Sequence, residues 1–223
     1  MKVSFVGTED VATGIKTFWF KPSQKIRYIA GQFIELSLPY KKPDDRGTKR
    51  WFTLSSPPSE FLVSITTKIS NKPSTFKQTL FELKKDDKVN MSSPMGDFIL
   101  PKSKSAPVVF IAGGIGCTPF HSIIAETQIN GENRDINLYY SVKIEEELAF
   151  TATFLNLGAA FHKIVGQSLN INDVIKNTTI PAKTHFYISG PEPMVEELEK
   201  ELLARKIKKS YIHTDFFPGY SEI

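Results

Sequence analysis

The sequence feature that most constrains the fold is the run "VVFIA" at 108–112, which leads directly into the stretch "GGIGCTPF". A continuous apolar run of this kind is typical of a parallel β-strand that is buried on both faces. The glycines that follow permit a tight turn and let a ligand approach the backbone closely. Together they predict a buried strand that ends in a ligand-binding turn.

A helix start is predicted immediately after this turn. Thr118 is a suitable N-cap, and Pro119 then takes the first helical position, where its missing N–H costs nothing. Because a helix N-terminus presents free N–H groups and a positive dipole end, the turn is a candidate phosphate site. The residues assigned to it are Gly113, Gly114, Gly116, Thr118 and Pro119.

Two alternatives to this interpretation stay open. The motif differs from G-x-G-x-x-G because proline replaces the last glycine, so the glycines could serve packing alone. A methyl-donor enzyme with a glycine-rich first turn is the other alternative. Many nucleotide binders place an acidic residue after the second strand, whereas this strand ends "YYSVK". Ser141 and Lys143 suit a phosphate better than a bare diol, which favours NADP(H), although Lys143 is equally an ordinary surface lysine.

Strands and helices alternate through the second half of the chain. Strands are predicted at 108–112, 136–142, 161–167, 184–190 and 209–217, and helices at 119–128, 145–158, 171–177 and 191–206. This alternation predicts a doubly wound parallel sheet in an α/β domain.

The first half has a different pattern. Six runs rich in Val, Ile, Phe and Thr lie at 2–13, 15–23, 31–39, 49–56, 60–69 and 87–100, and they predict an antiparallel β-barrel. Between them, Phe76, Leu80 and Leu83 follow helical spacing, and Ser74 or Thr75 could cap that helix. We place the boundary near 102–105, with a barrel domain at 1–103 and an α/β domain at 104–223.

Charge and cysteine content restrict the class of protein. The chain of 223 residues has a net charge of +4, and counting along it gives +7 for 1–103 and −3 for 104–223. The basic half could bind phosphates, nucleic acid or an acidic protein, or be an ordinary solvated surface. Its lysines form no stripe with interleaved aromatic residues, so we expect no nucleic-acid partner. With a single cysteine, Cys117, the chain cannot build a disulfide framework or a four-cysteine iron–sulfur cluster.

No run is long enough to span a membrane, and the first ten residues lack the apolar core of a signal peptide. We therefore expect a cytoplasmic protein without membrane insertion. The four histidines show no metal-ligand spacing, so we expect no metal site.

One strand carries an unexpected cation. In "RWFTLSS" at 50–56, period-2 alternation places Arg50 and Phe52 on the same face. Taken alone, the simplest interpretation of Arg50 is a surface salt bridge.

The combination of this strand with the glycine turn resembles the ferredoxin–NADP reductase superfamily. The similarity is greatest to compact two-domain flavin oxidoreductases without an iron–sulfur domain. The matching pieces are "AGQF" (30–33), "RWFTLSS" (50–56), "STFKQTL" (74–80), "GDFIL" (96–100), "AGGIGCTPF" (112–120), "YISGPEPM" (187–194) and "HTDFFPGY" (213–220). They occur in order over the whole chain.

The resemblance implies a flavin site in the barrel. Arg50 pairs with the flavin phosphate, which suits a guanidinium fork, while Phe52 meets the ring system and Thr53 lies near flavin N5. The helix start at 74–77 matches a pyrophosphate site, although Ser74 and Lys77 stand where relatives have glycine and serine. The flavin contacts implied are Arg50, Trp51, Phe52, Thr53, Ile65, Thr66, Thr67, Ser74, Thr75, Phe76 and Lys77. We expect FAD, with FMN as the alternative.

The resemblance also implies a nicotinamide site. Ser189 stands where relatives have cysteine near the nicotinamide, and Asp215 polarises the site or relays a proton. Gly190, Pro191, Glu192 and Phe216 complete the nucleotide contacts. The implied catalytic residues are Thr53, Ser189 and Asp215. A terminal segment merely docked in the domain cleft is the alternative for "DFFPGY", Met194 is equally core or site, and we expect packing for Phe98.

The implied activity is hydride transfer from NADPH or NADH to the flavin, followed by electron transfer to an acceptor such as an acidic ferredoxin or flavodoxin. Reduction of free flavin, quinone or ferric complexes stays an alternative. A non-catalytic module that keeps the fold is an alternative from another class.

Overall fold

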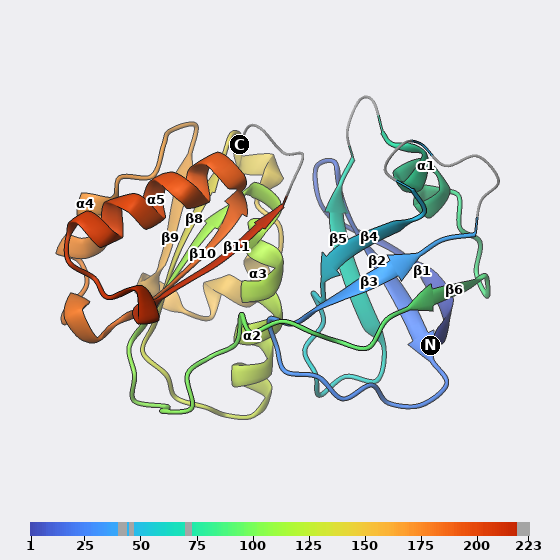
Figure 1. Ribbon diagram of the computed structural model, residues 1–223, viewed down its shortest axis with the longest axis horizontal. Helices are drawn as coiled ribbons and strands as arrows, with labels where there is room; N and C mark the ends of the chain where they lie inside the picture. The colour runs from blue at the N-terminus through green and yellow to red at the C-terminus, as the bar shows by residue number, and fades with distance from the viewer. Residues whose placement is uncertain (40–43, 45–46, 70–72, 218–223) are drawn as a thin grey trace.

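The computed structural model describes residues 1–39, 44, 47–69 and 73–217. In these residues the barrel half forms an antiparallel sheet of six strands in the order β4-β3-β6-β1-β2-β5 (Figure 1). The strands are β1 (Lys2–Ala12), β2 (Ile15–Pro22), β3 (Phe33–Ser37), β4 (Lys49–Thr53), β5 (Val63–Lys68) and β6 (Lys88–Met91). A bridge between Leu54 and Ile65 and a hydrogen bond from the Ser55 amide to the Ser64 carbonyl join the outer strands. The sheet therefore closes, as the sequence pattern predicts.

The barrel interior is apolar and one end is covered by helix α1 (Thr75–Phe81). Phe76 and Leu80 of α1 are fully buried among the strand side chains. Ser74 is the N-cap, and its hydroxyl accepts a hydrogen bond from the Lys77 amide at 3.3 Å. The predicted helix and one of its two candidate caps are confirmed.

The second half forms a parallel sheet in the order β11-β10-β7-β8-β9. Its strands are β7 (Val108–Gly113), β8 (Ile136–Val142), β9 (Phe161–Val165), β10 (His185–Pro191) and β11 (Ile212–Phe217). The helices are α2 (Cys117–Ile129), α3 (Thr151–Leu155), α4 (Ile171–Lys176) and α5 (Glu192–Ala204). Short 3₁₀ turns are η1 (Gly114–Gly116), η2 (Glu145–Glu147), η3 (Gly158–Ala160), η4 (Pro181–Lys183) and η5 (Lys209–Tyr211).

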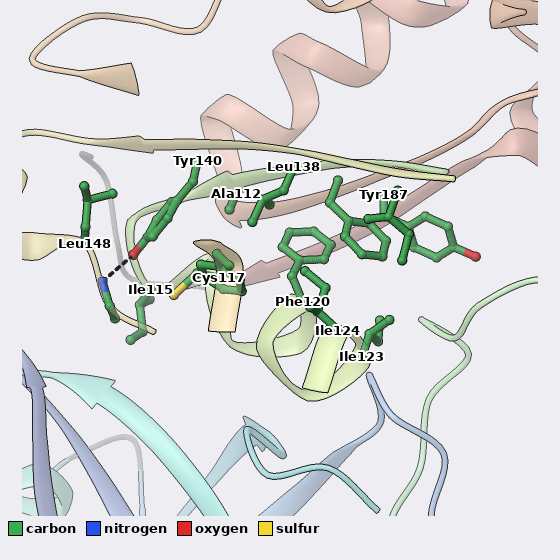
Figure 2. Close-up of a cluster of buried hydrophobic side chains, with 14 of the residues drawn as sticks. Ala112, Ile115, Cys117, Phe120, Ile123, Ile124, Leu138, Tyr140, Leu148 and Tyr187 are labelled. Atoms are coloured by element: carbon green, nitrogen blue, oxygen red, sulfur yellow. Dashed lines mark hydrogen bonds between the residues drawn. The ribbon is translucent and has the colours of Figure 1, made fainter. Parts of the chain in front are cut away.

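Helices cover both faces of this sheet, which confirms the doubly wound prediction (Figure 1). Alternate strand residues face opposite cores. Phe110 and Tyr140 pack against α2 and α3 on the side nearer the barrel, while Val109 and Ile111 pack against α4 and α5. Figure 2 shows the first core, where the Tyr140 hydroxyl accepts a hydrogen bond from the Ala149 amide at 3.3 Å.

The first core also holds residues from the barrel half. Ile15, Ala30 and Phe98 are buried in it, and the Phe98 ring lies 5.8 Å from that of Phe120. The packing role predicted for Phe98 is confirmed. The predicted domain boundary falls in the connection between β6 and β7 and stays a prediction.

Two predicted elements differ from the structure. The expected helix at 145–158 is divided into η2 and α3, because Phe150 between them has a left-handed backbone with φ 59°. The helix after the glycine turn begins at Cys117 with Gly116 as its N-cap, so the expectation that Thr118 caps it and Pro119 starts it is wrong. The 3₁₀ turn η1 runs directly into α2, and this places Thr118 inside the helix, where it is buried.

Candidate functional site

The parallel sheet has its switch point between β7 and β10. Strand β7 pairs with β8 on one side and with β10 on the other, and all three run parallel. Connections therefore leave in opposite directions at the carboxyl ends of β7 and β10, where open α/β sheets bind ligands. Gly113 ends β7 and Pro191 ends β10, so both predicted nucleotide turns lie at this edge of the sheet.

Three predicted catalytic side chains meet beside it. Asp215 of β11 is aligned with Ser189 of β10, and Thr53 comes from the end of β4 in the barrel. The hydroxyls of Thr53 and Ser189 both donate to Asp215 Oδ2 at 3.4 Å, which is long for such a bond. The structure thus joins segments 162 positions apart in the chain.

Burial raises the pKa of Asp215 to about 6, while the hydrogen bonds from Thr53 and Ser189 oppose that rise. The carboxyl is therefore mainly ionised at neutral pH but close to titration. An ionised carboxylate only accepts hydrogen bonds, so it holds both hydroxyls as donors to itself. Their remaining lone pairs can then accept a hydrogen bond from a bound group.

The two faces of β4 have separate surroundings. Arg50 and Phe52 lie on one face, and both contact the ring of Phe76. The Phe52 ring lies 5.9 Å from the Phe76 ring, and the Arg50 guanidinium lies 5.2 Å from the centre of the same Phe76 ring. Trp51 and Thr53 alternate onto the other face. Trp51 is 67% exposed, so the structure separates it from Arg50 and Phe52.

The predicted pyrophosphate site is an anion site in the structure. The carboxylate of Asp44 lies 3.2 Å from Arg50 Nη2 and accepts a hydrogen bond from the Thr75 amide at 3.3 Å. Arg50 Nη1 also donates to the carbonyls of Gly47 and Lys49. A guanidinium and a helix N–H that hold a carboxylate have the donor chemistry that a phosphate needs.

The other flavin contacts implied by the resemblance are distributed around this site. Lys77 Nζ donates to the Lys68 carbonyl at 2.8 Å, at the end of β5. Ile65 belongs to the barrel core, and Thr66 hydrogen-bonds to Thr17 and Ser55 at 2.8 Å each. These side chains already have partners, so a ligand along this part of β5 would meet backbone groups, as the resemblance implies.

The glycine turn has a packing role at two of its three glycines. A Cβ on Gly116 would lie 2.1 Å from the Ser189 carbonyl oxygen, and one on Gly113 would lie 2.6 Å from Met194 Sδ. Gly190 is similarly close to Met194 and Gly113. Gly114 is different, because it has φ +52° and a Cβ there would meet no atom within 4 Å. The ligand approach predicted for this turn is therefore available at Gly114.

The remaining predicted nucleotide residues lie at or near the carboxyl ends of the strands. Ser141 is aligned with Gly113, is buried, and donates to the Gln167 carbonyl at 3.4 Å. Lys143 is exposed just beyond the end of β8. Glu192 begins α5, and Phe216 is 47% exposed beside Gly190. Met194 packs with the core around α5.

Sequence reasoning missed the contacts that hold the two halves together. His121 Nδ1 lies 2.6 Å from the Ser55 carbonyl, and the Ser122 hydroxyl donates to the Ser56 carbonyl at 2.6 Å. Burial lowers the pKa of His121 to about 4, so its ring is neutral and donates this bond. Both acceptors are backbone carbonyls, which every residue has, so no side-chain pattern in the sequence indicates these contacts.

Within the described residues, no group of three or more potential ligands is arranged to hold a metal ion, and no helix is long and apolar enough to cross a membrane.

Comparison with known proteins identifies the architecture. No family model matches the sequence. A ferredoxin NADP+ reductase from Neisseria gonorrhoeae, solved with FAD and NADP, superposes with a TM-score of 0.76 at 20% identity and covers 97% of this chain and 98% of its own. The chain has the two-domain fold of the ferredoxin–NADP reductase superfamily. The fold that the resemblance implies is confirmed.

The sequence relatives are longer proteins, of which this chain matches a part. Flavohemoprotein B of Dictyostelium discoideum is 27% identical over 91% of this chain, and the match spans 56% of that protein. The reductase component of propane 2-monooxygenase from Mycolicibacterium goodii is 25% identical over 97% of this chain and 67% of its own length. The chain thus spans about half the length of the flavohemoproteins it matches.

Proposed function

We propose that this protein is an NAD(P)H-dependent flavoprotein oxidoreductase. The observation that carries the proposal is the meeting of Thr53, Ser189 and Asp215, in which a flavin-strand hydroxyl and a nucleotide-strand hydroxyl share one carboxylate. Relatives named as flavohemoproteins and monooxygenase reductase components support the same chemistry. The barrel at 1–103 would bind the flavin and the α/β unit at 104–223 the nucleotide.

The donor set of the barrel fits FAD. Arg50 and the Thr75 amide would hold the pyrophosphate once the Asp44 carboxylate leaves, and Phe52 would meet the ring system. When bound, the flavin accepts a hydride at N5 from nicotinamide C4 and passes electrons onward. The nucleotide pyrophosphate would lie against Gly114. Of the two residues that favour NADP(H) in the sequence, the exposed Lys143 is placed to meet a phosphate, whereas Ser141 is buried and bonded to the Gln167 carbonyl.

The protein residues position the two reactants and polarise the groups that lie between the two halves. Ionised Asp215 keeps Thr53 and Ser189 as hydrogen-bond donors to itself, so both oxygens can accept from groups brought between the two halves. The bonds from α2 to Ser55 and Ser56 fix β4 relative to the nucleotide turn. Holding two reactants in contact in this way supplies much of the rate enhancement of such reactions.

Anaerobic mixing with NADPH and with NADH tests the proposal. The purified protein should be yellow, and one nucleotide should bleach the flavin absorbance within seconds. The faster nucleotide identifies the coenzyme preference. A colourless protein that takes up neither FAD nor FMN would refute the assignment and favour the non-catalytic alternative.

Arg50→Ala is predicted to lose flavin during purification. Charge-assisted hydrogen bonds contribute about 1.5–3 kcal/mol each, so losing the guanidinium should weaken flavin binding by at least about tenfold. Flavin content per polypeptide, from absorbance after gel filtration, measures the effect. Asp44→Asn is the matched variant: it removes the competing carboxylate, so flavin should be retained at the wild-type level or above. Full retention by Arg50→Ala would show that the phosphate anchor is misplaced.

The proposal also includes the class of electron acceptor. An acidic ferredoxin or flavodoxin fits the basic charge of the barrel half, and free flavin, quinone and ferric complexes are the competing acceptors. A cytoplasmic location stays a prediction from the sequence.

A further inference from the structure

Two histidines that the proposed hydride transfer does not use meet on neighbouring strands of the parallel sheet. His185 begins β10, and His213 lies on β11, which is beside β10 at the end of the strand order (Figure 1). The Nδ1 atom of His185 lies 3.1 Å from the Nε2 atom of His213, although the two residues are 28 positions apart in the chain. No local spacing in the sequence could therefore reveal this pair.

Aromatic neighbours hold the two imidazole rings in place. The His213 ring stacks on that of Tyr187, with ring centroids 4.2 Å apart. Tyr187 is itself fixed, because its hydroxyl donates a hydrogen bond to the Ile99 carbonyl at 2.6 Å. The His185 ring lies 4.7 Å from that of Tyr211 and is within 18° of parallel to the His213 ring. The pair is thus preorganised, which reduces the entropy that is lost when a ligand binds.

Both rings can present a nitrogen lone pair to a ligand. A hydrogen bond between two ring nitrogens needs an acceptor lone pair, so at least one of the rings is neutral. Burial lowers the pKa of both histidines, that of His213 to about 4. Neutral imidazole is the commonest side-chain ligand for metal ions. The ring that donates the hydrogen bond can carry its proton on the other nitrogen instead, because neutral imidazole has two tautomers.

The distance between the two nitrogens indicates the kind of metal ion. Two imidazole nitrogens that each lie about 2.0–2.1 Å from one ion, and 3.1 Å from each other, subtend an angle of about 98° at that ion. This is close to the right angle of the tetragonal sites that Cu²⁺ and Ni²⁺ prefer. The last side-chain torsion of histidine is soft, so small ring rotations can turn both lone pairs toward one ion. Both residues are only partly buried, so water can complete the coordination.

The charges around the pair are compatible with a cation. The negative charge of Asp97 acts on His213 in the direction that raises its pKa, and the same charge attracts a metal ion. Lys209 acts on His213 in the opposite direction, but it forms an ion pair with Glu199 that compensates part of its charge.

We propose that His185 and His213 form a binding site for a divalent late transition-metal ion, with Cu²⁺ bound more tightly than Ni²⁺ or Zn²⁺. The ion bridges β10 and β11, and water supplies its remaining ligands. Among the described strands, β11 pairs with β10 alone, so the ion links this outer strand to the rest of the sheet. Because the pair is assembled only in the folded chain, the ion stabilises the fold as its concentration rises.

Titration of the untagged protein with CuSO4, NiCl2 and ZnCl2 in a buffer that does not bind metal ions tests the site. Calorimetry measures the affinity, and pulsed EPR of bound Cu²⁺ counts the imidazoles that coordinate it. His185→Gln and His213→Gln each remove one ligand. His162→Gln is the matched control, since His162 is also partly buried and stacks on a tyrosine of the same unit, Tyr139, at 4.3 Å.

At its tightest site the wild type should bind Cu²⁺ through two imidazoles, and added Cu²⁺ should raise the urea concentration at the midpoint of unfolding. Each variant of the pair should bind Cu²⁺ at least about tenfold more weakly and with at most one imidazole. His162→Gln should keep the wild-type affinity and both imidazoles. One imidazole or none in the wild type, which can be measured even if a variant fails to fold, would overturn the site. Unchanged affinity in both variants of the pair, or equal losses in all three variants, would also overturn it.

Discussion

Replacing Asp215 by asparagine is expected to slow flavin reduction by NAD(P)H by about 100-fold or more, since removing one preorganised polar group from a reaction site costs about 10²–10³ in kcat. The carboxylate is the shared acceptor of the Thr53 and Ser189 hydroxyls. An asparagine amide can also donate, so these hydroxyls would no longer be held as donors to the same atom. Stopped-flow absorbance of the flavin at saturating nucleotide measures the change.

The pH dependence of that rate should identify the ionised group. Because the pKa of Asp215 is about 6, the carboxylate is the main form above pH 7 and the neutral acid below pH 5. We expect the wild-type rate to be constant at high pH and to fall as pH decreases through 6. Asp215→Asn should show no inflection there, because its side chain does not titrate. Asp173→Asn, at an exposed position on α4, is the matched control and should keep the wild-type profile.

The same substitution should stabilise the fold at neutral pH. Folding raises the pKa of Asp215 from 3.8 to about 6, so the native state binds more protons than the unfolded chain between these values. Stability due to this group therefore falls as pH rises from 3.8 to 6 and stays low above it. The shift corresponds to at most about 3 kcal/mol. Asp215→Asn should gain part of this free energy at pH 8 and none at pH 3.5, as urea denaturation would show. If Asp215→Asn and the wild type had the same free energy of unfolding at pH 8 as well as at pH 3.5, and the same rate of flavin reduction, the role assigned to Asp215 would be refuted.

The sequence predicts the two-domain architecture because local pattern determines it. Strand alternation in the first half and the continuous run "VVFIA" followed by helices in the second distinguish a barrel from a parallel sheet. Sheet order and barrel closure are not local properties. The Leu54–Ile65 bridge and the position of β10 beside β7 follow from packing across the chain.

The site is predictable only in part from the sequence. Alternation places Arg50 and Phe52 together but leaves open where Thr53 points, and the answer depends on Asp215, which is 162 positions away. Asp44 also had no sequence signal, although its carboxylate occupies the predicted anion site. The docking of α2 on Ser55 and Ser56 is likewise a contact between halves that no local pattern reports.

The glycine turn shows how one pattern can serve two purposes. From the sequence, Gly113, Gly114 and Gly116 are all assigned to the same candidate phosphate site. In the structure, Gly116 is required by close packing against the backbone of β10, Gly113 lies against the movable end of the Met194 side chain, and Gly114 alone of the three has open space beside it. Packing and ligand binding are therefore separable by substitution at neighbouring positions.

Gly116→Ala is accordingly expected to destabilise the α/β unit by more than about 3 kcal/mol, a large part of ordinary domain stability. The added Cβ would lie 2.1 Å from the Ser189 carbonyl oxygen and 2.7 Å from the Gly190 amide nitrogen, and backbone atoms of a central strand cannot move aside cheaply. Gly114→Ala is the matched variant, since it meets no atom within 4 Å and carries only the strain of φ +52°, about 1–2 kcal/mol. Circular dichroism in urea measures both variants.

The two variants should rank in the opposite order for nucleotide affinity: Gly114→Ala, the more stable variant, should bind NADPH more weakly. Gly114→Ala should fold yet bind NADPH at least about tenfold more weakly, because its methyl group occupies the space in which a phosphate would approach the backbone. Gly116→Ala should bind normally in whatever fraction remains folded, since its methyl group points at β10. If Gly116→Ala were as stable as the wild type, β10 would have moved at Ser189 to admit the methyl group, and the packing requirement for glycine at position 116 would be refuted.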